Sequence, residues 1–253
     1  MSETIGYIDS IESFGLVDGP GVRSVLFLVG CPFRCLYCHN PETWTGKGKM
    51  QLTPEQAFQL LYRFHPYWRD NGGITISGGE PLLQIDFLLE LAKIAKKNHV
   101  SVTIDTSGAT FQNNEDYLKK FDELLSYCSL FMVDIKSIDL DTHIKITGKG
   151  NENVIEMFHY LDQKNFPIWI RHVLVPGLTD DDSMLKRTGQ FIASLHNVQR
   201  VEVLPYHSLM IPKYQKLGIP YPLMDTPIPL EERIKNAETL LGCEQYQKYL
   251  GGK

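Results

Sequence analysis

Short runs of hydrophobic residues alternate along this chain with stretches in which hydrophobic residues recur every three or four positions. The runs are rich in Val, Ile and Phe and are mostly continuous in hydrophobicity, which is typical of strands covered on both faces of a sheet. The pattern predicts six strands: Ser24–Val29, Ile74–Ser77, Ser101–Asp105, Leu130–Ile135, Ile168–Val175 and Arg200–Leu204.

The stretches with helical spacing lie between these strands, and each predicts a helix with one apolar face. Five such faces run over residues 57–64, 87–95, 117–125, 154–161 and 184–195. Thr53 and Thr179 look like helix starts, because each hydroxyl is followed by acidic residues in a first turn. The segment Met210–Pro229, rich in Pro and Tyr, is expected to wrap the surface before a last helix near Leu230–Leu241.

Six strands with intervening helices predict an α/β fold with a parallel sheet. Because strand–helix–strand crossovers are right-handed, the sheet should wind in one direction, as a barrel or an open part of one. No linker, repeat or low-complexity tract divides the chain, so we expect one domain over residues 1–253.

The composition is that of an ordinary globular protein, with 43% hydrophobic and 22% charged residues. No stretch reaches the roughly 18 apolar residues that a membrane span needs, and Met1 to Ser10 lack the features of a secretory signal. A net charge of -5 argues against a large nucleic-acid surface. We therefore expect a cytoplasmic protein that binds neither nucleic acid nor membranes.

Three of the five cysteines lie in one loop, CPFRCLYCHN at residues 31–40, directly after the first predicted strand. Crowded cysteines in a reducing compartment indicate metal binding more than disulfides. The thiolates of Cys31, Cys35 and Cys38, spaced C-x3-C-x2-C, can converge on three corners of a [4Fe–4S] cluster and leave the fourth iron open for a ligand.

A structural zinc site formed by the three cysteines and His39 is the alternative interpretation. The geometry disfavours it, because Cys38 and His39 are adjacent and cannot easily point at one metal. The other two cysteines, Cys128 and Cys243, are better interpreted as small buried hydrophobic residues.

Polar residues recur where the predicted strands end, which is where barrel enzymes place their active sites. Gly78, Gly79 and Glu80 follow the second strand, as a turn or as a segment whose free carbonyls accept hydrogen bonds from an ammonium group. Asp105 with Thr106 ends the third strand, and Asp134 with Lys136 ends the fourth.

Buried carboxylates need a cationic partner, which Lys136, a charged ligand or a metal ion could supply. The simpler alternatives are a helix cap for Asp105 and a surface pair for Asp134 and Lys136.

At these residues the chain resembles the radical S-adenosylmethionine enzymes, whose signature is C-x3-C-x2-C with an aromatic residue before the third cysteine, here Tyr37. The run DGPGVRSVLFLVGCPFRCLYCHNPE at 18–42 is similar in particular to the glycyl-radical-enzyme activases. The similarity continues through SGGEPLLQ at 77–84, DTSG at 105–108, MVDIK at 132–136, WIRHVLVPG at 169–177 and LPYH at 204–207.

The resemblance implies a partial (β/α)6 barrel of the radical S-adenosylmethionine type, in agreement with the six strand–helix units. It implies an anaerobic enzyme in which a reduced [4Fe–4S] cluster cleaves S-adenosyl-L-methionine. The resulting 5′-deoxyadenosyl radical removes a hydrogen atom from a glycine Cα of a partner enzyme.

The resemblance also assigns roles to residues of this chain. It implies that the segment with Gly78, Gly79 and Glu80 holds the amino group of the cofactor, and that Asp105, Thr106, Met132 and Asp134 surround a monovalent cation. It implies further cofactor contacts from Tyr37, Cys38, His39, Ile135, Lys136 and His207, with Lys136 counted among the catalytic residues. Arg171, in the fifth strand, should point inward if side chains alternate along the strand, and is expected to orient the cofactor or the substrate loop.

His207 could instead be structural, and Asp18 is either part of a plain turn or a contact to the partner's glycine loop.

Pyruvate formate-lyase is the expected partner, because residues 40–73 contain no cysteine. Many activases of other glycyl-radical enzymes, such as diol or choline lyases, carry extra cysteine clusters in that interval. A non-catalytic metal-binding module would not need the motifs at successive strand ends. We also expect a monomer and an electron donor of the flavodoxin or ferredoxin type, although the sequence does not identify the donor.

Overall fold

The computed structural model describes residues 4–46 and 48–247 of the chain. Its centre is an eight-stranded sheet with the order β3-β1-β2-β4-β5-β6-β7-β8. The six predicted strands are confirmed, and they pair with one another in parallel. They are β2 (Arg23–Leu28), β4 (Gly73–Gly78), β5 (Ser101–Thr106), β6 (Leu130–Asp134), β7 (Ile168–Leu174) and β8 (Val198–Pro205).

Two further strands, β1 (Gly6–Gly15) and β3 (Met50–Leu52), extend the sheet in antiparallel fashion beyond β2. The sequence did not predict them. β1 carries polar residues such as Asp9 and Glu12, and its pairing with β2 is interrupted by two register shifts. An irregular strand near the edge of a sheet lacks the continuous hydrophobicity that revealed the parallel strands.

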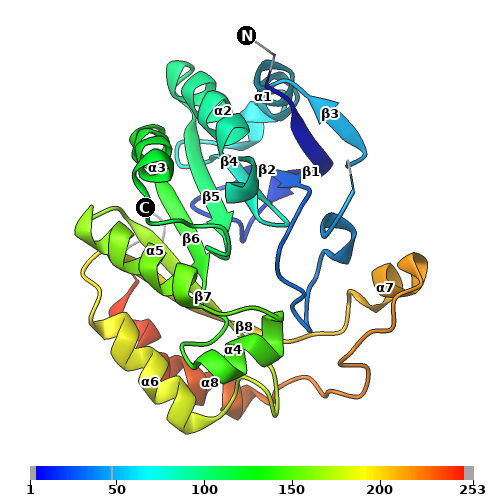
Figure 1. The fold of residues 1–253 in the computed structure, drawn as a ribbon, viewed down its shortest axis with the longest axis vertical. Helices are drawn as coiled ribbons and strands as arrows, with labels where there is room; N and C mark the ends of the chain where they lie inside the picture. Colours follow the sequence, from blue (N-terminus) through cyan, green and yellow to red (C-terminus); the bar gives the residue numbers. More distant parts are fainter. Residues whose placement is uncertain (1–3, 47, 248–253) are drawn as a thin grey trace.

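Helices cover the outer face of the curved sheet (Figure 1). Six of them were predicted: α1 (Pro54–Tyr62), α2 (Ile85–Lys97), α3 (Glu115–Tyr127), α5 (Glu152–Gln163), α6 (Asp182–Ala193) and α8 (Glu231–Leu241). Thr53 caps α1 in a capping box with Gln56. The expected cap at Thr179 is wrong: Asp181 caps α6, while the Thr179 hydroxyl bonds to the backbone of Val173 and Val175.

The segment Met210–Pro229 does more than wrap the surface. It contains helix α7 (Ile211–Leu217), which the sequence did not predict, and buries Tyr214 and Tyr221. These rings pack with Tyr37 and Tyr206 in a hydrophobic cluster separate from the main core. Helix α4 (Leu140–Thr147) was also missed. Within the described residues, four short 3-10 helices complete the elements: η1 (Pro41–Thr43), η2 (His65–Tyr67), η3 (Pro81–Gln84) and η4 (Cys243–Gln245).

The main core lies between the sheet and its helices, where side chains such as Leu26, Ile76 and Ile104 are fully buried. Parallel pairing brings the carboxyl ends of the strands to one end of the sheet. The register sets Asp105 beside Met132 and Asp134 beside Arg171. The polar residues that end the predicted strands therefore meet there. No helix in the described part of the chain is long and apolar enough to cross a membrane.

Candidate active site

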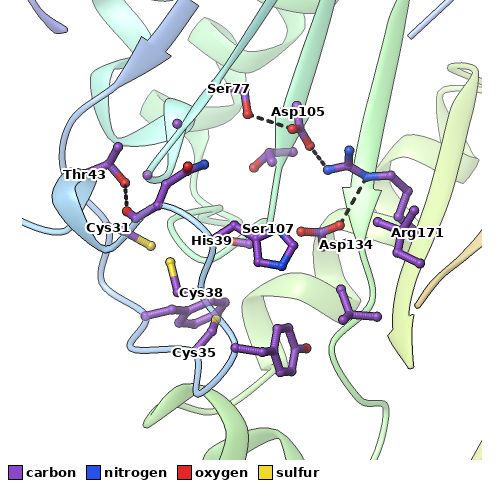
Figure 2. Close-up of a pocket in the computed structure, with 18 of the residues that line it drawn as sticks. Cys31, Cys35, Cys38, His39, Thr43, Ser77, Asp105, Ser107, Asp134 and Arg171 are labelled. Carbon is purple, nitrogen blue, oxygen red and sulfur yellow. Dashed lines mark hydrogen bonds and ion pairs between the residues drawn. The ribbon is translucent and has the colours of Figure 1, made fainter. Parts of the chain in front are cut away.

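A cavity of about 440 Å³ opens at this end of the sheet (Figure 2). It is lined by most of the residues that the sequence predicted for the site: Asp18, Cys31, Cys35, Tyr37, Cys38, His39, Gly78, Gly79, Asp105, Thr106, Asp134, Lys136, Arg171 and His207. Three predicted residues, Glu80, Met132 and Ile135, are not part of its lining.

The cysteine loop leaves β2 and is held by backbone hydrogen bonds to its surroundings. The Arg34 and Leu36 amides donate to the carbonyls of Thr147 and Ile146, at 2.8 and 3.0 Å, at the end of α4. The Cys38 amide donates to the Cys35 carbonyl at 3.0 Å, which closes a turn. All three cysteines are free and line the cavity.

The three thiols fit a metal cluster. Burial raises the pKa of Cys31 and of Cys35 to about 12 and also raises that of Cys38. Thiolates here therefore need bound cationic charge, which the irons of a cluster would supply.

Within residues 4–46 and 48–247, no three His, Cys, Asp or Glu side chains gather closely enough to bind one ion. A single zinc ion would need its ligands on one atom, whereas in a cubane cluster each thiolate binds a different iron, so the three cysteines suit a cluster better than zinc.

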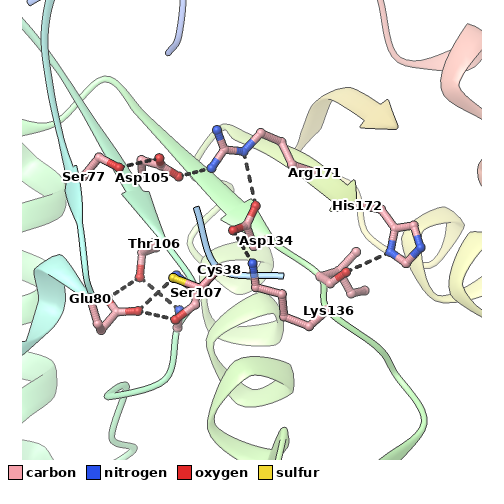
Figure 3. A network of polar contacts seen from close by, with 12 residues as sticks. Cys38, Ser77, Glu80, Asp105, Thr106, Ser107, Asp134, Lys136, Arg171 and His172 are labelled. Atoms are coloured by element: carbon pink, nitrogen blue, oxygen red, sulfur yellow. Dashed lines mark hydrogen bonds and ion pairs between the residues drawn. The ribbon is translucent and has the colours of Figure 1, made fainter. Parts of the chain in front are cut away.

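A charged network also lines the cavity (Figure 3). Arg171 pairs directly with Asp105, and its Nε lies 3.3 Å from Oδ1 of Asp134. Lys136 Nζ lies 2.7 Å from the other oxygen of Asp134, and the Ser77 hydroxyl donates to Asp105 at 2.7 Å. The Lys136 and Asp134 side chains are only 12% and 19% exposed, which excludes the surface-pair alternative.

The two carboxylates differ in their pKa. Burial alone would raise the pKa of Asp134, but Lys136 and Arg171 outweigh it and hold the pKa below its usual value. Burial raises the pKa of Asp105 to about 6, against the opposing effect of Arg171. With two acids and two bases, the wall is close to electrically neutral.

The residues expected around a monovalent cation have other partners in the structure. The Thr106 hydroxyl donates to Glu80, and Met132 is fully buried beside Leu130 and Trp169. Asp105 and Asp134 are matched by Arg171 and Lys136. The cation stays a prediction.

The Gly78-Gly79 turn packs closely against the start of the cysteine loop. Gly78 has a φ of 120°, and a Cβ there would lie 2.2 Å from the backbone nitrogen of Leu28. A Cβ on Gly79 would lie 2.2 Å from the carbonyl oxygen of Gly30. Only glycine allows this approach, so the turn is more than a generic strand-to-helix connection.

Glu80 belongs to the segment predicted to hold the cofactor's amino group, and its side chain bonds within the protein. Glu80 is fully buried and accepts hydrogen bonds from Thr106 Oγ1 and from the backbone and hydroxyl of Ser107. It also accepts from the Leu82 amide at 3.0 Å, at the start of η3. These donors hold the carboxylate behind the cavity wall, where it fixes the 105–108 segment.

Aromatic rings line a third side of the cavity. The His39 and His207 ring centroids lie 4.4 Å apart, and Lys136 Nζ lies 5.5 Å from the centre of the Tyr37 ring. Burial, aided by neighbouring cationic groups, lowers the pKa of His39 to about 4, so its ring is neutral near pH 7. The Ile135 side chain packs in the main core, and the contact of this residue to the cofactor stays a prediction.

Asp18 lies in the loop between β1 and β2 and lines the cavity, and its contact to the partner's glycine loop stays a prediction. Its carbonyl accepts a hydrogen bond from the Thr75 hydroxyl at 2.6 Å, and burial raises the pKa of its half-buried carboxyl. Arg23, fully buried, donates from Nε to Thr75 at 3.0 Å and thereby secures the same loop.

The cavity lining also contains polar residues that were not among the predicted site residues: Asn40, Thr43, Trp44, Ser77 and Ser107. Ser107 belongs to the DTSG motif, so its position after the strand end was a usable signal. Trp44 lies beyond the cysteine motif and gave no such signal. It reaches Cys38 only because the chain turns back at η1.

Comparison with known proteins defines the class. The sequence model of the Radical SAM superfamily matches residues 25–187, which is more than half of the chain. A crystal structure of a domain of pyruvate-formate lyase-activating enzyme from Bacteroides vulgatus is similar, with a TM-score of 0.56 and 26% identity, covering 68% of this chain and 93% of that one. The fold and the cysteine site are thus those of a radical SAM protein.

Two curated relatives narrow the assignment. The pyruvate formate-lyase-activating enzyme of Streptococcus mutans is 46% identical over 246 residues, which cover 96% of this chain and 94% of that protein. The enzyme of the same name from Listeria monocytogenes serovar 1/2a is 41% identical over 248 residues, covering 98% and 100%. The chain belongs to the family of pyruvate formate-lyase-activating enzymes, which confirms the resemblance recognised in its motifs.

Proposed function

We propose that this protein activates pyruvate formate-lyase under anaerobic conditions by generating a glycyl radical on it. The observation that carries the proposal is that one cavity is lined both by three thiols and by charged side chains whose opposite charges balance. The relatives named for this activity, which match nearly the whole chain, support it.

Cys31, Cys35 and Cys38 would hold the [4Fe–4S] cluster and leave one iron without a protein ligand. When bound, the cluster and S-adenosyl-L-methionine supply reductive cleavage of a carbon–sulfur bond and removal of a hydrogen atom from a glycine Cα. The protein's own task is to position these groups and to exclude water.

The charged wall would bind the amino-acid part of the cofactor. Lys136 and Arg171 can face its carboxylate, and the carboxylates of Asp105 and Asp134 can face its cationic groups. The backbone of Gly78 and Gly79 would accept from the amino group. A monovalent cation at Asp105, Thr106, Met132 and Asp134 is a further part of the proposal.

The adenine would lie against the rings of Tyr37, His39 and His207. Because His39 is neutral near pH 7, it can stack on a neutral base without the cost of burying a charge. The backbone of Cys38 lies next to these rings in sequence and would contact the same part of the cofactor.

Asp18 would meet the glycine-bearing loop of the partner, because it lines the cavity and follows the exposed residues Leu16 and Val17. An activase of a diol or choline lyase is the second candidate. The absence of cysteines from residues 40–73 favours pyruvate formate-lyase. We further propose a cytoplasmic monomer with one domain over residues 1–253, reduced by a flavodoxin- or ferredoxin-type donor.

The test is anaerobic incubation of the reconstituted protein with S-adenosyl-L-methionine, a strong reductant and pyruvate formate-lyase. A glycyl-radical signal in electron paramagnetic resonance should appear, with one 5′-deoxyadenosine for each radical. A parallel reaction with a diol or choline lyase should give no radical. A signal only in the parallel reaction would overturn the partner, and cofactor cleavage without any glycyl radical would overturn the substrate class.

Asp18→Ala tests the contact to the partner's loop. We expect radical formation to slow about tenfold or more, the cost of losing a hydrogen bond to a charged group, with little change in cofactor affinity. Asp86→Ala is the control, because Asp86 is 63% exposed and pairs with Lys120 on the outer helices. Equal loss of cofactor affinity and radical formation in Asp18→Ala would contradict this role.

A further inference from the structure

Trp44 donates a hydrogen bond from its indole Nε1 to the sulfur of Cys38, at 3.2 Å. Among the described residues, Cys38 is the one member of the cysteine motif that receives a hydrogen bond from another side chain. The three thiols of the motif therefore differ in their hydrogen bonding. Neither the motif nor the roles proposed above account for the indole.

Packing on the ring fixes the direction of this N–H group. The Arg34 guanidinium lies 5.2 Å from the centre of the indole, and the Tyr214 ring meets it edge-on at 5.8 Å. Arg34 is itself held, because its Nη1 donates to the carbonyls of Cys31 and Phe33 at 2.6 and 2.7 Å.

The backbone of Trp44 is also anchored to the cysteine loop. Its carbonyl accepts from the Cys31 amide at 3.3 Å, and its amide donates to Pro41 at 3.2 Å. The Tyr214 hydroxyl donates to the Cys38 carbonyl at 3.2 Å. Contacts from the cysteine loop, η1 and α7 thus hold the donor and its acceptor in place together.

A hydrogen bond to a cluster thiolate affects the two oxidation states unequally. Reduction adds one electron from the donor protein to the cluster, which makes the cluster and its thiolates more negative. A donor aimed at a thiolate stabilises the more negative state more, and hydrogen bonds to the sulfurs are known determinants of cluster potential.

We propose that Trp44 is a positioning residue that raises the reduction potential of the cluster by donating its indole N–H to Cys38. The inference rests on the proposed function in one respect, that Cys31, Cys35 and Cys38 hold the cluster. Trp44 would make the cluster easier to reduce without binding iron itself.

Trp44→Phe tests the proposal, because it removes the N–H and keeps an aromatic ring. The reconstituted protein is titrated potentiometrically with dithionite and the reduced cluster is followed by electron paramagnetic resonance. At a fixed potential near the midpoint, the ratio of reduced to oxidised cluster should fall about threefold to tenfold. A tenfold fall corresponds to about 59 mV for one electron.

Trp68→Phe is the matched control. Trp68 is also largely buried, and its indole donates to the Ser24 hydroxyl at 2.9 Å, away from the cysteine loop. Its loss should leave the cluster potential unchanged. An equal shift in both variants would mean that loosened packing, and not the hydrogen bond, sets the potential, and would overturn the proposal.

If Trp44→Phe loses iron, replacement of Trp44 by β-(3-benzothienyl)alanine keeps the ring shape and removes only the N–H. If either variant binds the cluster and its reduction potential equals that of the natural protein, the proposal is overturned. Loss of iron from both would also overturn it, because Trp44 would then be needed to hold the cluster. Failure of the unmodified protein to assemble a cluster would instead overturn the proposed function.

Discussion

Two walls of the cavity differ in how their buried polar groups are stabilised. The thiol wall consists of Cys31, Cys35 and Cys38, and the charged wall of Asp105, Asp134, Lys136 and Arg171. Burial raises the pKa of all three thiols, so that the folded chain favours their neutral form. In the charged wall, each carboxylate is paired with a base, and Asp134 is paired with two.

The difference indicates which wall forms without a bound metal or cofactor. In the charged wall the acids and bases already neutralise one another in the folded chain, although Asp134 Oδ1 and Arg171 Nε form an ion pair at 3.3 Å without a hydrogen bond. The thiol wall is completed only by bound metal. Substitutions should therefore act differently on the two walls: at the thiols they remove a ligand, and at the charged wall they leave a partner with an unbalanced charge.

Loss of one thiol should have the largest effect. Cys35→Ala leaves two thiolates for a cluster that needs three, so we expect loss of most iron and of all S-adenosyl-L-methionine cleavage. The same holds for Cys31→Ala and Cys38→Ala. Iron and sulfide analysis after anaerobic reconstitution measures the first effect, and 5′-deoxyadenosine yield measures the second.

Cys128→Ala and Cys243→Ala are the controls for this prediction. Both cysteines are free and pack against the main hydrophobic core away from the loop, so their loss should leave iron content and cleavage intact. A full and active cluster in Cys35→Ala would refute the assignment of the thiol wall.

A change in the charged wall should have a smaller effect. Asp134→Asn removes the carboxylate that pairs with both Lys136 and Arg171, and the uncompensated charge should disturb the cofactor's amino-acid site. We expect S-adenosyl-L-methionine affinity to fall about tenfold to a hundredfold, as for loss of a charged hydrogen bond, with iron content unchanged. Calorimetric titration of the reconstituted protein measures the affinity.

Asp122→Asn is the matched control, because Asp122 also pairs with a lysine at 2.7 Å but both side chains are 42% exposed. Exposed pairs contribute little, so this variant should bind the cofactor normally. Unchanged affinity in Asp134→Asn would show that the charged wall is structural. Lost iron in that variant would show that the two walls are not independent.

Sequence patterns predicted the parallel part of the fold well, because β2 and β4 to β7 are mostly buried along their length, although β8 is only partly buried. They failed at β1, whose polar residues and register shifts hide the strand. They also failed at α7, a short helix in a proline-rich segment whose tyrosines pack beside the cysteine loop. Local patterns do not report such tertiary packing.

The same limit applied to the site. Most of the site residues predicted from local motifs line the cavity, because functional groups at strand ends recur at fixed places in the barrel. The motifs could not distinguish a side chain facing the cavity from one facing away, as Glu80 and Ile135 show. Neither could they show that Arg171 joins both carboxylates, which depends on the register of β6 and β7.

The smallest expected effect distinguishes the two acids of the charged wall by their proton affinity. With a pKa of about 6 in the folded state and about 3.9 unfolded, Asp105 binds a proton between these values only when the protein is folded. Its contribution to stability should therefore fall as the pH rises from about 4 to about 6, and then level off. Chemical denaturation of the metal-free protein is measured at several pH values for the natural sequence and for Asp105→Asn. The difference between their unfolding free energies gives the contribution of Asp105.

Asp181→Asn is the control. Hydrogen bonds from Ser183 and Met184 hold the pKa of Asp181 below its usual value, so its difference should stay flat above about pH 4.5. A difference for Asp105 that instead grows with pH would mean that the pair with Arg171 outweighs burial, and that both carboxylates of the charged wall are ionised alike.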